Sequence, residues 1–434
     1  MFAITPARVI DGTGAGPLDR AVVVVDGDRI AEVLPSRASL PSSIEVIEAP
    51  ESTLLPGLVD AHLHVAGLVT NAMFEVDDPL AFADSFMRRL TAHGILTVRD
   101  TGSPDVGYSF DLFKRGRPGW PRFFGSGFNL DGPPGGPWQG LRVVSDGAEA
   151  ARAVTTLVDG GADFVKLYAW MELDVIRAAT DAAHARGARV AAHVGHRVTA
   201  IDAVVAGVDA LEHVRIGREL LSDDDLNALS QRPPRGSDPL VSFAAWRYID
   251  PDGDRARELV RVLAGRGTVI TPTLCLSESV LRPTGRPDLV GDWEIGGSVE
   301  RTWDAFAYDA DFDDEDRRWA SVELERQMAF LGLAHAGGVR LAAGTDTPNP
   351  YISPGNSLHR ELELLVACGL SPLAAIHAVT GAAADLIGSN DVGRIERGRA
   401  ADLLLVGGDP TTDIRSTRNI ETVIIGGQPI IDRR

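Results

Sequence analysis

Apolar positions in the middle of the chain occur in short runs, and helical patterns lie between several of these runs. This alternation is typical of strand–helix–strand units, in which parallel strands are buried on both faces. Eight runs over about 300 residues indicate a (β/α)8 TIM barrel of the α/β class. The strands are predicted at residues 58–65, 95–100, 122–127, 164–168, 189–193, 210–214, 269–274 and 339–345.

The two ends of the chain carry a different pattern, with strand-like runs separated by tight turns. A valine-rich run at 21–25, the turn Asp26-Gly27-Asp28 and a second run at 29–33 together indicate a hairpin. Further strand-like runs and glycine turns follow residue 400. We therefore expect residues 1–55 and 390–434 to form one small composite β-sandwich, and residues 56–389 to form the barrel.

Composition indicates an ordinary soluble globular protein with a large core. The 434 residues are 44% hydrophobic and 24% charged, which suits one large barrel with an accessory unit. A formal net charge of −19 disfavours nucleic acid and anionic membranes as partners. No apolar run reaches the roughly 18 residues of a membrane-spanning helix, and no signal peptide is evident, so we expect a cytoplasmic protein. The acidic run at 304–316 is expected to be a solvated face or loop.

Four histidines and one aspartate lie at the ends of predicted strands, where TIM-barrel active sites are built. His62 and His64 are two residues apart on one strand, so they project from the same face. His193 and His213 end two consecutive strands, and Asp346 follows an apolar strand and a glycine. Taken alone, His193 or His213 could be a satisfied core residue and Asp346 a helix N-cap.

Lys166 is unusual for both its residue type and its position. Only Lys114 and Lys166 are lysines among the 42 basic residues, and Lys166 interrupts an apolar strand. Burial lowers the pKa of a lysine, and a neutral amine can add carbon dioxide to become a carbamate that bridges two metal ions. A structural lysine in an ion pair would fit the same position. Together with the other five residues, a carbamate would complete a ligand set for two divalent ions, with zinc favoured.

These motifs resemble the amidohydrolase superfamily, in particular the imidazolonepropionase-like branch that includes Xaa-Pro and other carboxy-terminal dipeptidases. The resemblance spans nearly the whole chain and rests on the segments 56–64, 344–346, 357–363 and 393–404 together with Lys166, His193 and His213. It implies that Lys166 is carboxylated and bridges two metal ions. Many relatives carry a glycine- and histidine-rich loop after the third strand, but the loop at 129–138 has no histidine here. The dipeptide specificity of the family therefore cannot simply be transferred.

The favoured activity is hydrolysis of an amide bond in a small molecule such as a dipeptide or an N-acyl amino acid. In this hypothesis His62, His64 and Asp346 hold one ion, His193 and His213 hold the other, and the two ions share the attacking hydroxide. Asp346 acts as general base and then as general acid. Tyr168, His196 and Arg197 are candidate substrate contacts, although each could equally be a structural residue at the barrel rim.

Three other functions compete with amide hydrolysis. The same site could hydrolyse a lactone, a carbamate, an ester or a phosphotriester. A mononuclear deaminase is disfavoured because Lys166 would then have no task. A non-enzymatic scaffold predicts lost ligands, yet all six are present. The resemblance also allows a homo-oligomer.

Overall fold

The computed structural model describes residues 1–35, 40, 43–70, 74–136, 140–195, 197–214, 216, 218–231, 243–279, 281, 297–306 and 314–433. Within these residues, eight parallel strands form a barrel, as the apolar runs predict. They are β6 (Leu58–Leu63), β7 (Ile95–Asp100), β8 (Arg122–Gly125), β11 (Phe164–Leu167), β12 (Arg189–Ala192), β13 (Ala210–Glu212), β14 (Val269–Thr271) and β15 (Arg340–Leu341).

Backbone hydrogen bonds close the barrel between strands that are not paired along their length. The amide of Asp163, just before β11, donates to the carbonyl of Gly125 in β8 at 2.9 Å. On the other side, the amide of Ala61 in β6 donates to the carbonyl of Ala343, just after β15, at 3.0 Å. The first and last strands of the barrel are thus neighbours, and the (β/α)8 prediction is confirmed.

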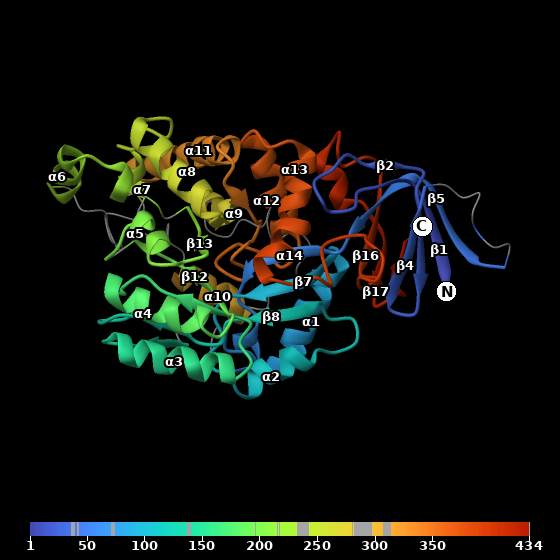
Figure 1. Cartoon of the computed structure of the whole chain (residues 1–434), viewed down its shortest axis with the longest axis horizontal. Helices are drawn as coiled ribbons and strands as arrows, with labels where there is room; N and C mark the ends of the chain where they lie inside the picture. Colours follow the sequence, from blue (N-terminus) through green and yellow to red (C-terminus); the bar gives the residue numbers. More distant parts are fainter. Residues whose placement is uncertain are drawn as a thin grey trace.

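Helices follow the strands and cover the outside of the barrel (Figure 1). Several begin at side-chain caps: Asp146 accepts from the amide of Glu149 at 2.8 Å, and Ser371 caps a helix with proline at its first position. The helices are α1 (Pro79–Ala92), α2 (Tyr108–Arg115), α3 (Gly147–Asp159), α4 (Leu173–His184), α5 (Ala200–Val205), α6 (Asp223–Gln231), α7 (Phe243–Trp246), α8 (Asp254–Arg266), α9 (Leu274–Ser279), α10 (Gly297–Phe306), α11 (Asp314–Ala336), α12 (Asn356–Ala367), α13 (Pro372–Ala378) and α14 (Gly381–Ile387).

The acidic run at 304–316 is only partly described. Residues 304–306 end α10, residues 314–316 begin α11, and residues 307–313 lie outside the described residues. Among the described helices, none combines the length and apolar character needed to cross a membrane.

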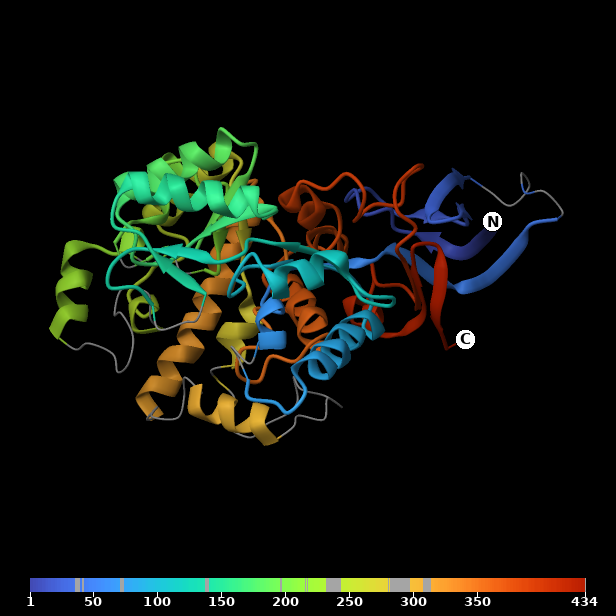
Figure 2. The same ribbon diagram turned by 90° about the horizontal axis from the view of Figure 1, so that it is seen from below.

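Strands from both chain ends form one separate sheet, which confirms the predicted composite β unit. Its order is β18-β17-β16-β5-β1-β3-β4, with β2 paired to β1. Figures 1 and 2 show the N-terminal and C-terminal strands side by side, away from the barrel. The strands are β1 (Phe2–Val9), β2 (Leu18–Asp19), β3 (Val22–Asp26), β4 (Arg29–Leu34), β5 (Glu45–Pro56), β16 (Leu403–Gly407), β17 (Ile420–Ile425) and β18 (Gln428–Asp432).

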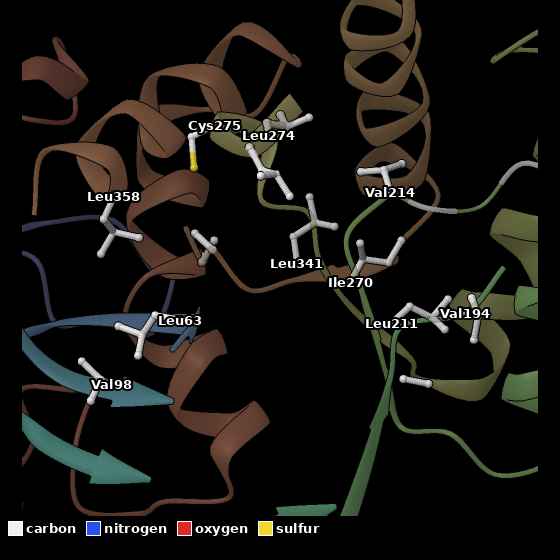
Figure 3. Packing of buried hydrophobic residues seen from close by; sticks show 14 of the residues in the cluster. Leu63, Val98, Val194, Leu211, Val214, Ile270, Leu274, Cys275, Leu341 and Leu358 are labelled. Carbon is white, nitrogen blue, oxygen red and sulfur yellow. The ribbon is translucent and has the colours of Figure 1, made fainter. Parts of the chain in front are cut away.

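Alternation along the barrel strands separates the helix-facing core from the barrel interior. Val165 and Leu167 of β11 pack in the large core between strands and helices, whereas Phe164 belongs to an inner cluster. Other helix-facing residues, such as Val98 and Leu211, are visible in Figure 3. Lys166 is two residues from Phe164, so it lies on the inner face. The inner cluster is otherwise built largely from small residues, including Ala61, Ala191, Ala210 and Ala342, which leaves room there for long polar side chains.

Five of the predicted strands extend two to four residues too far at their carboxyl ends. The chain leaves the sheet at Leu63, Gly125, Glu212, Thr271 and Leu341. Thr273 has a φ of 50°, and the next residue begins α9. His213 and Asp346 both have a φ of 64°, in the left-handed region that non-glycine residues rarely adopt. The predicted strands are too long because hydrophobicity continues into turns that aim side chains at the barrel mouth.

Candidate metal centre

Three of the predicted ligands form a compact group at the carboxyl ends of the barrel strands. His62 on β6, His213 after β13 and Asp346 after β15 each offer a ligand atom within 4.8 Å of the others, and all three side chains are buried. Left-handed backbone at His213 and Asp346 costs free energy, and such strain gathers at functional sites. The fold therefore brings together residues from three separate strand ends.

The Asp346 carboxylate lies at the centre of this group. Its Oδ1 is 3.1 Å from His64 Nε2 and 3.4 Å from His62 Nε2, and its Oδ2 is 3.8 Å from His213 Nε2. Burial opposes ionisation of Asp346, but interactions with His62, His64 and His213 hold its pKa well below the usual range. Within the described residues, Oδ1 is buried and has no hydrogen-bond donor in good geometry. A divalent cation would satisfy this oxygen and the ring nitrogens around it.

His193 extends the group on one side. The centroids of the His193 and His213 rings are 4.8 Å apart, and the Tyr168 ring lies 4.7 Å from His193. Tyr168 is thus brought to the same mouth of the barrel as the predicted ligands.

Lys166 is buried in the barrel interior, with 1% of its surface exposed. Burial lowers the pKa of its amine to about 8, although the carboxylates of Glu212 and Asp346 act in the opposite direction. No hydrogen bond or ion pair reaches its Nζ within the described part of the chain. The sequence left open the alternative of a structural lysine in an ion pair. Lys166 has no partner for such a pair among these residues.

Buried carboxylates that the strand-end pattern does not single out support the ligands. Glu212 Oε2 lies 2.6 Å from His62 Nδ1, and Arg99 donates to Glu212 Oε1 at 2.8 Å. Burial opposes ionisation of Glu212, but Arg99 and His62 hold its pKa well below the usual range. Asp60 accepts hydrogen bonds from the amides of His62 and Thr345, and burial raises its pKa to about 7. Asp60 interrupts an apolar strand and Glu212 ends one, and a charged residue in an apolar strand is the same signal that marks Lys166.

The remaining predicted contacts have different outcomes. His196 lies outside the described residues. Arg197 is 43% exposed, pairs with Glu172 at 3.4 Å and lies 5.6 Å from the centre of the Trp170 ring. In the described part of the chain, no hydrogen bond or ion pair joins Arg197 to a predicted ligand. Its proposed role as a substrate clamp would require the side chain to leave Glu172.

The loop at 129–138 is anchored beside the strand of Lys166. Residues 129–131 form β9 (Asn129–Asp131), which pairs with β11 and with β10 (Leu141–Val143). Asp131 accepts from the amides of Gly136 and Trp170, each at 2.8 Å. Residues 137 and 138 lie outside the described residues.

A (β/α)8 barrel with histidines and an aspartate at its strand ends is an architecture of metal-assisted hydrolysis. The chain belongs to the amidohydrolase family, whose model matches residues 53–430.

Solved structures share the fold over the whole chain. A Xaa-Pro dipeptidase with methionine bound in its active site is 22% identical, with a TM-score of 0.72 and 99% of both chains covered. A putative prolidase from Bifidobacterium longum is 25% identical, with a TM-score of 0.69, and the match covers 100% of this chain and 96% of that one.

A curated relative matches a smaller part of the chain. An uncharacterized protein of Mycobacterium tuberculosis is 34% identical over 172 residues, which are 37% of this chain and 44% of the relative. The match thus spans less than half of that relative's length.

Proposed function

We propose that the protein is a binuclear metal-dependent amidohydrolase that cleaves an amide bond in a small substrate such as a dipeptide or an N-acyl amino acid. The single observation that carries this proposal is the buried Asp346 carboxylate, whose Oδ1 faces the Nε2 atoms of His62 and His64 without a well-aligned donor. His62, His64 and Asp346 would hold one divalent ion, for which we favour zinc. His193 and His213 would hold the second.

Carboxylated Lys166 would bridge the two ions. In this modification the neutral Nζ adds to the carbon of carbon dioxide. The nitrogen–carbon bond forms as one carbon–oxygen π bond breaks, its electron pair moves to that oxygen, and the nitrogen loses a proton to solvent. Burial favours the neutral amine because it lowers the pKa of Lys166 to about 8. The product carries an anionic carboxylate in place of an amine, which suits a position shared by two cations.

The bound ions would polarise the scissile carbonyl and ease deprotonation of the attacking water. Asp346 then has two tasks: its carboxylate accepts the proton of the attacking water, and it returns that proton to the leaving nitrogen as the carbon–nitrogen bond breaks. Tyr168, packed on the His193 ring, would donate its hydroxyl hydrogen to the substrate's carboxylate or to the oxygen on which negative charge develops.

An amino-acid-containing substrate is supported by the fold neighbours, one a Xaa-Pro dipeptidase with bound methionine and one a putative prolidase. A panel of dipeptides and N-acyl amino acids, screened beside lactones, carbamates, esters and phosphotriesters, tests this choice. Turnover restricted to the second group would replace amide cleavage with the alternative bond type.

Metal content per chain tests the site itself. Protein purified with bicarbonate should hold about two zinc-like ions per chain, and this number should fall in K166A. The matched control is K114A, because the chain has one other lysine, which is partly exposed and paired with Asp163 at 2.6 Å. With 13C-labelled bicarbonate, a carbamate resonance should be present in wild type and K114A and absent in K166A. About one ion, unaffected by K166A, would indicate a mononuclear site and direct the search to deamination.

A further inference from the structure

A charged pair lies in the barrel interior beside His62. Arg99 on β7 and Glu212 on β13 are both buried, and Arg99 Nη1 donates to Glu212 Oε1 at 2.8 Å. The other carboxylate oxygen, Oε2, is 2.6 Å from His62 Nδ1. Three barrel strands thus contribute to one hydrogen-bonded chain that ends on a candidate ligand.

We propose that Glu212, supported by Arg99, is a positioning residue that sets the tautomer and orientation of His62 so that Nε2 is free to bind a divalent cation. The inference rests on the proposed function. An ionised carboxylate can only accept hydrogen bonds, so Nδ1 of His62 carries a hydrogen, and in the neutral imidazole Nε2 then keeps its lone pair. That nitrogen faces Asp346 Oδ1 at 3.4 Å.

His213 shows the same arrangement with a different partner. Its Nδ1 lies 2.7 Å from Thr273 Oγ1, and its Nε2 faces Asp346. Both imidazoles are therefore held through Nδ1 and present Nε2 to the same carboxylate. Glu212 also precedes His213 directly in the chain, so one strand end supplies a candidate ligand and orients another.

Arg99 has a separate role, which is to stabilise the buried negative charge of Glu212. Its Nη1 also donates to the carbonyl of Ala61 at 2.9 Å, and its guanidinium lies 3.9 Å from the centre of the Phe164 ring. Without Arg99, Glu212 would be an unpaired buried charge, which strongly destabilises a fold. Stability thus depends on the pair, whereas the orientation of His62 depends on the Glu212 oxygen alone.

The variant E212Q separates these tasks. Arg99 and His62 Nδ1 both need an acceptor, but a glutamine offers only one oxygen. Because the charged guanidinium makes the stronger bond, we expect the amide oxygen to face Arg99 and the NH2 group to face His62. That arrangement selects the tautomer with hydrogen on Nε2, which cannot bind a metal ion. Zinc affinity should fall about 10- to 100-fold, and the visible absorption of the cobalt(II)-substituted protein should change.

E361Q is the matched control, since Glu361 is also fully buried but binds the backbone amides of Leu274 and Cys275. It should keep wild-type zinc affinity and the wild-type cobalt spectrum. The double variant R99M/E212L removes both charges, so it should be more stable than R99M alone. Its zinc affinity should nevertheless stay low, because His62 still lacks its acceptor.

Titration of metal-free protein with zinc chloride, together with urea unfolding of the same variants, decides the question. Wild-type affinity in E212Q, or affinity that recovers together with stability in R99M/E212L, would overturn the positioning role while leaving the proposed function intact. A wild-type protein that binds no zinc and no cobalt would instead overturn the proposed function, and this inference with it.

Discussion

Thr345, in the segment after the last barrel strand, is hydrogen-bonded to Asp60 in the first strand. Thr345 Oγ1 donates to Asp60 Oδ2 at 2.7 Å, and the amide of Thr345 donates to Asp60 Oδ1 at 3.1 Å. Asp60 precedes His62 by two residues, and Thr345 directly precedes Asp346. The same contact that closes the barrel therefore sets the distance between two candidate metal ligands.

Removing the Thr345 hydroxyl should weaken this closure. T345V keeps the shape of the side chain but leaves Asp60 Oδ2 without its donor, so the free energy of unfolding should fall by about 1–3 kcal/mol. T422V is the matched control, because Thr422 Oγ1 is buried and finds no hydrogen-bond partner among the described residues. Its stability should be unchanged or slightly raised. Urea unfolding of both variants measures the difference, and equal stabilities would contradict this account.

Gly344 allows the backbone that follows the last barrel strand to approach His62 closely. A Cβ at this position would lie 2.6 Å from both the amide nitrogen and the Cβ of His62. We expect G344A to lower the free energy of unfolding by about 1–3 kcal/mol through overpacking. In contrast, G265A should raise it by about 0.5–1 kcal/mol, because Gly265 lies in α8 with open space around it. Thermal unfolding of the two variants should therefore shift in opposite directions; a G344A protein as stable as wild type would show that the strands can separate freely.

Asp346 is expected to move the proton during catalysis. Asparagine is nearly isosteric and tolerates the left-handed backbone found at this position. D346N should therefore retain much of its metal, yet its turnover should fall about 10²- to 10⁴-fold because an amide cannot accept the proton. Steady-state kinetics and elemental analysis of the same sample check this prediction. Turnover close to wild type would rule out the proton-transfer role.

Glu361 should make stability depend on pH. Burial raises the pKa of its carboxyl to about 7 from the ordinary value of 4.5. Between these values the folded protein binds a proton that the unfolded chain does not, so this group's stabilising contribution is present below pH 4.5 and is lost as the pH rises through about 7.

The variant E361Q removes this titration. Between pH 5 and pH 8, wild type should lose about 2–3 kcal/mol more of its unfolding free energy than E361Q does. Burial also raises the pKa values of Asp60 and Glu219 to about 7, but both groups are present in the two proteins and cancel in the comparison. Urea unfolding at the two pH values gives the result, and parallel pH profiles would show that Glu361 does not titrate in this range.

Local sequence patterns were sufficient to predict the barrel, and they also suggested the six residues that we propose as metal ligands. The pattern of apolar residues that marks a strand is set by residues close together in the chain. The apolar runs therefore located all eight barrel strands. Spacing predicted His62 and His64 on one strand, but β6 ends at Leu63, so His64 directly follows the strand. The apolar environment correctly marked Lys166 as buried. The exact strand ends were harder to predict. His213 and Asp346 lie just beyond their strands and have left-handed backbone, which hydrophobicity does not reveal.

Contacts between distant residues were decided only by the tertiary structure. Glu212 and His62 are 150 positions apart, and Asp60 and Thr345 are 285 positions apart. Which side chains meet depends on the stagger of eight strands around the closed barrel, a property of the whole fold rather than of any segment. The sequence by itself therefore determined which residue types stand at the barrel mouth. Only the closed barrel determined that His213 joins His62 around Asp346, and that Glu212 orients the ring of His62.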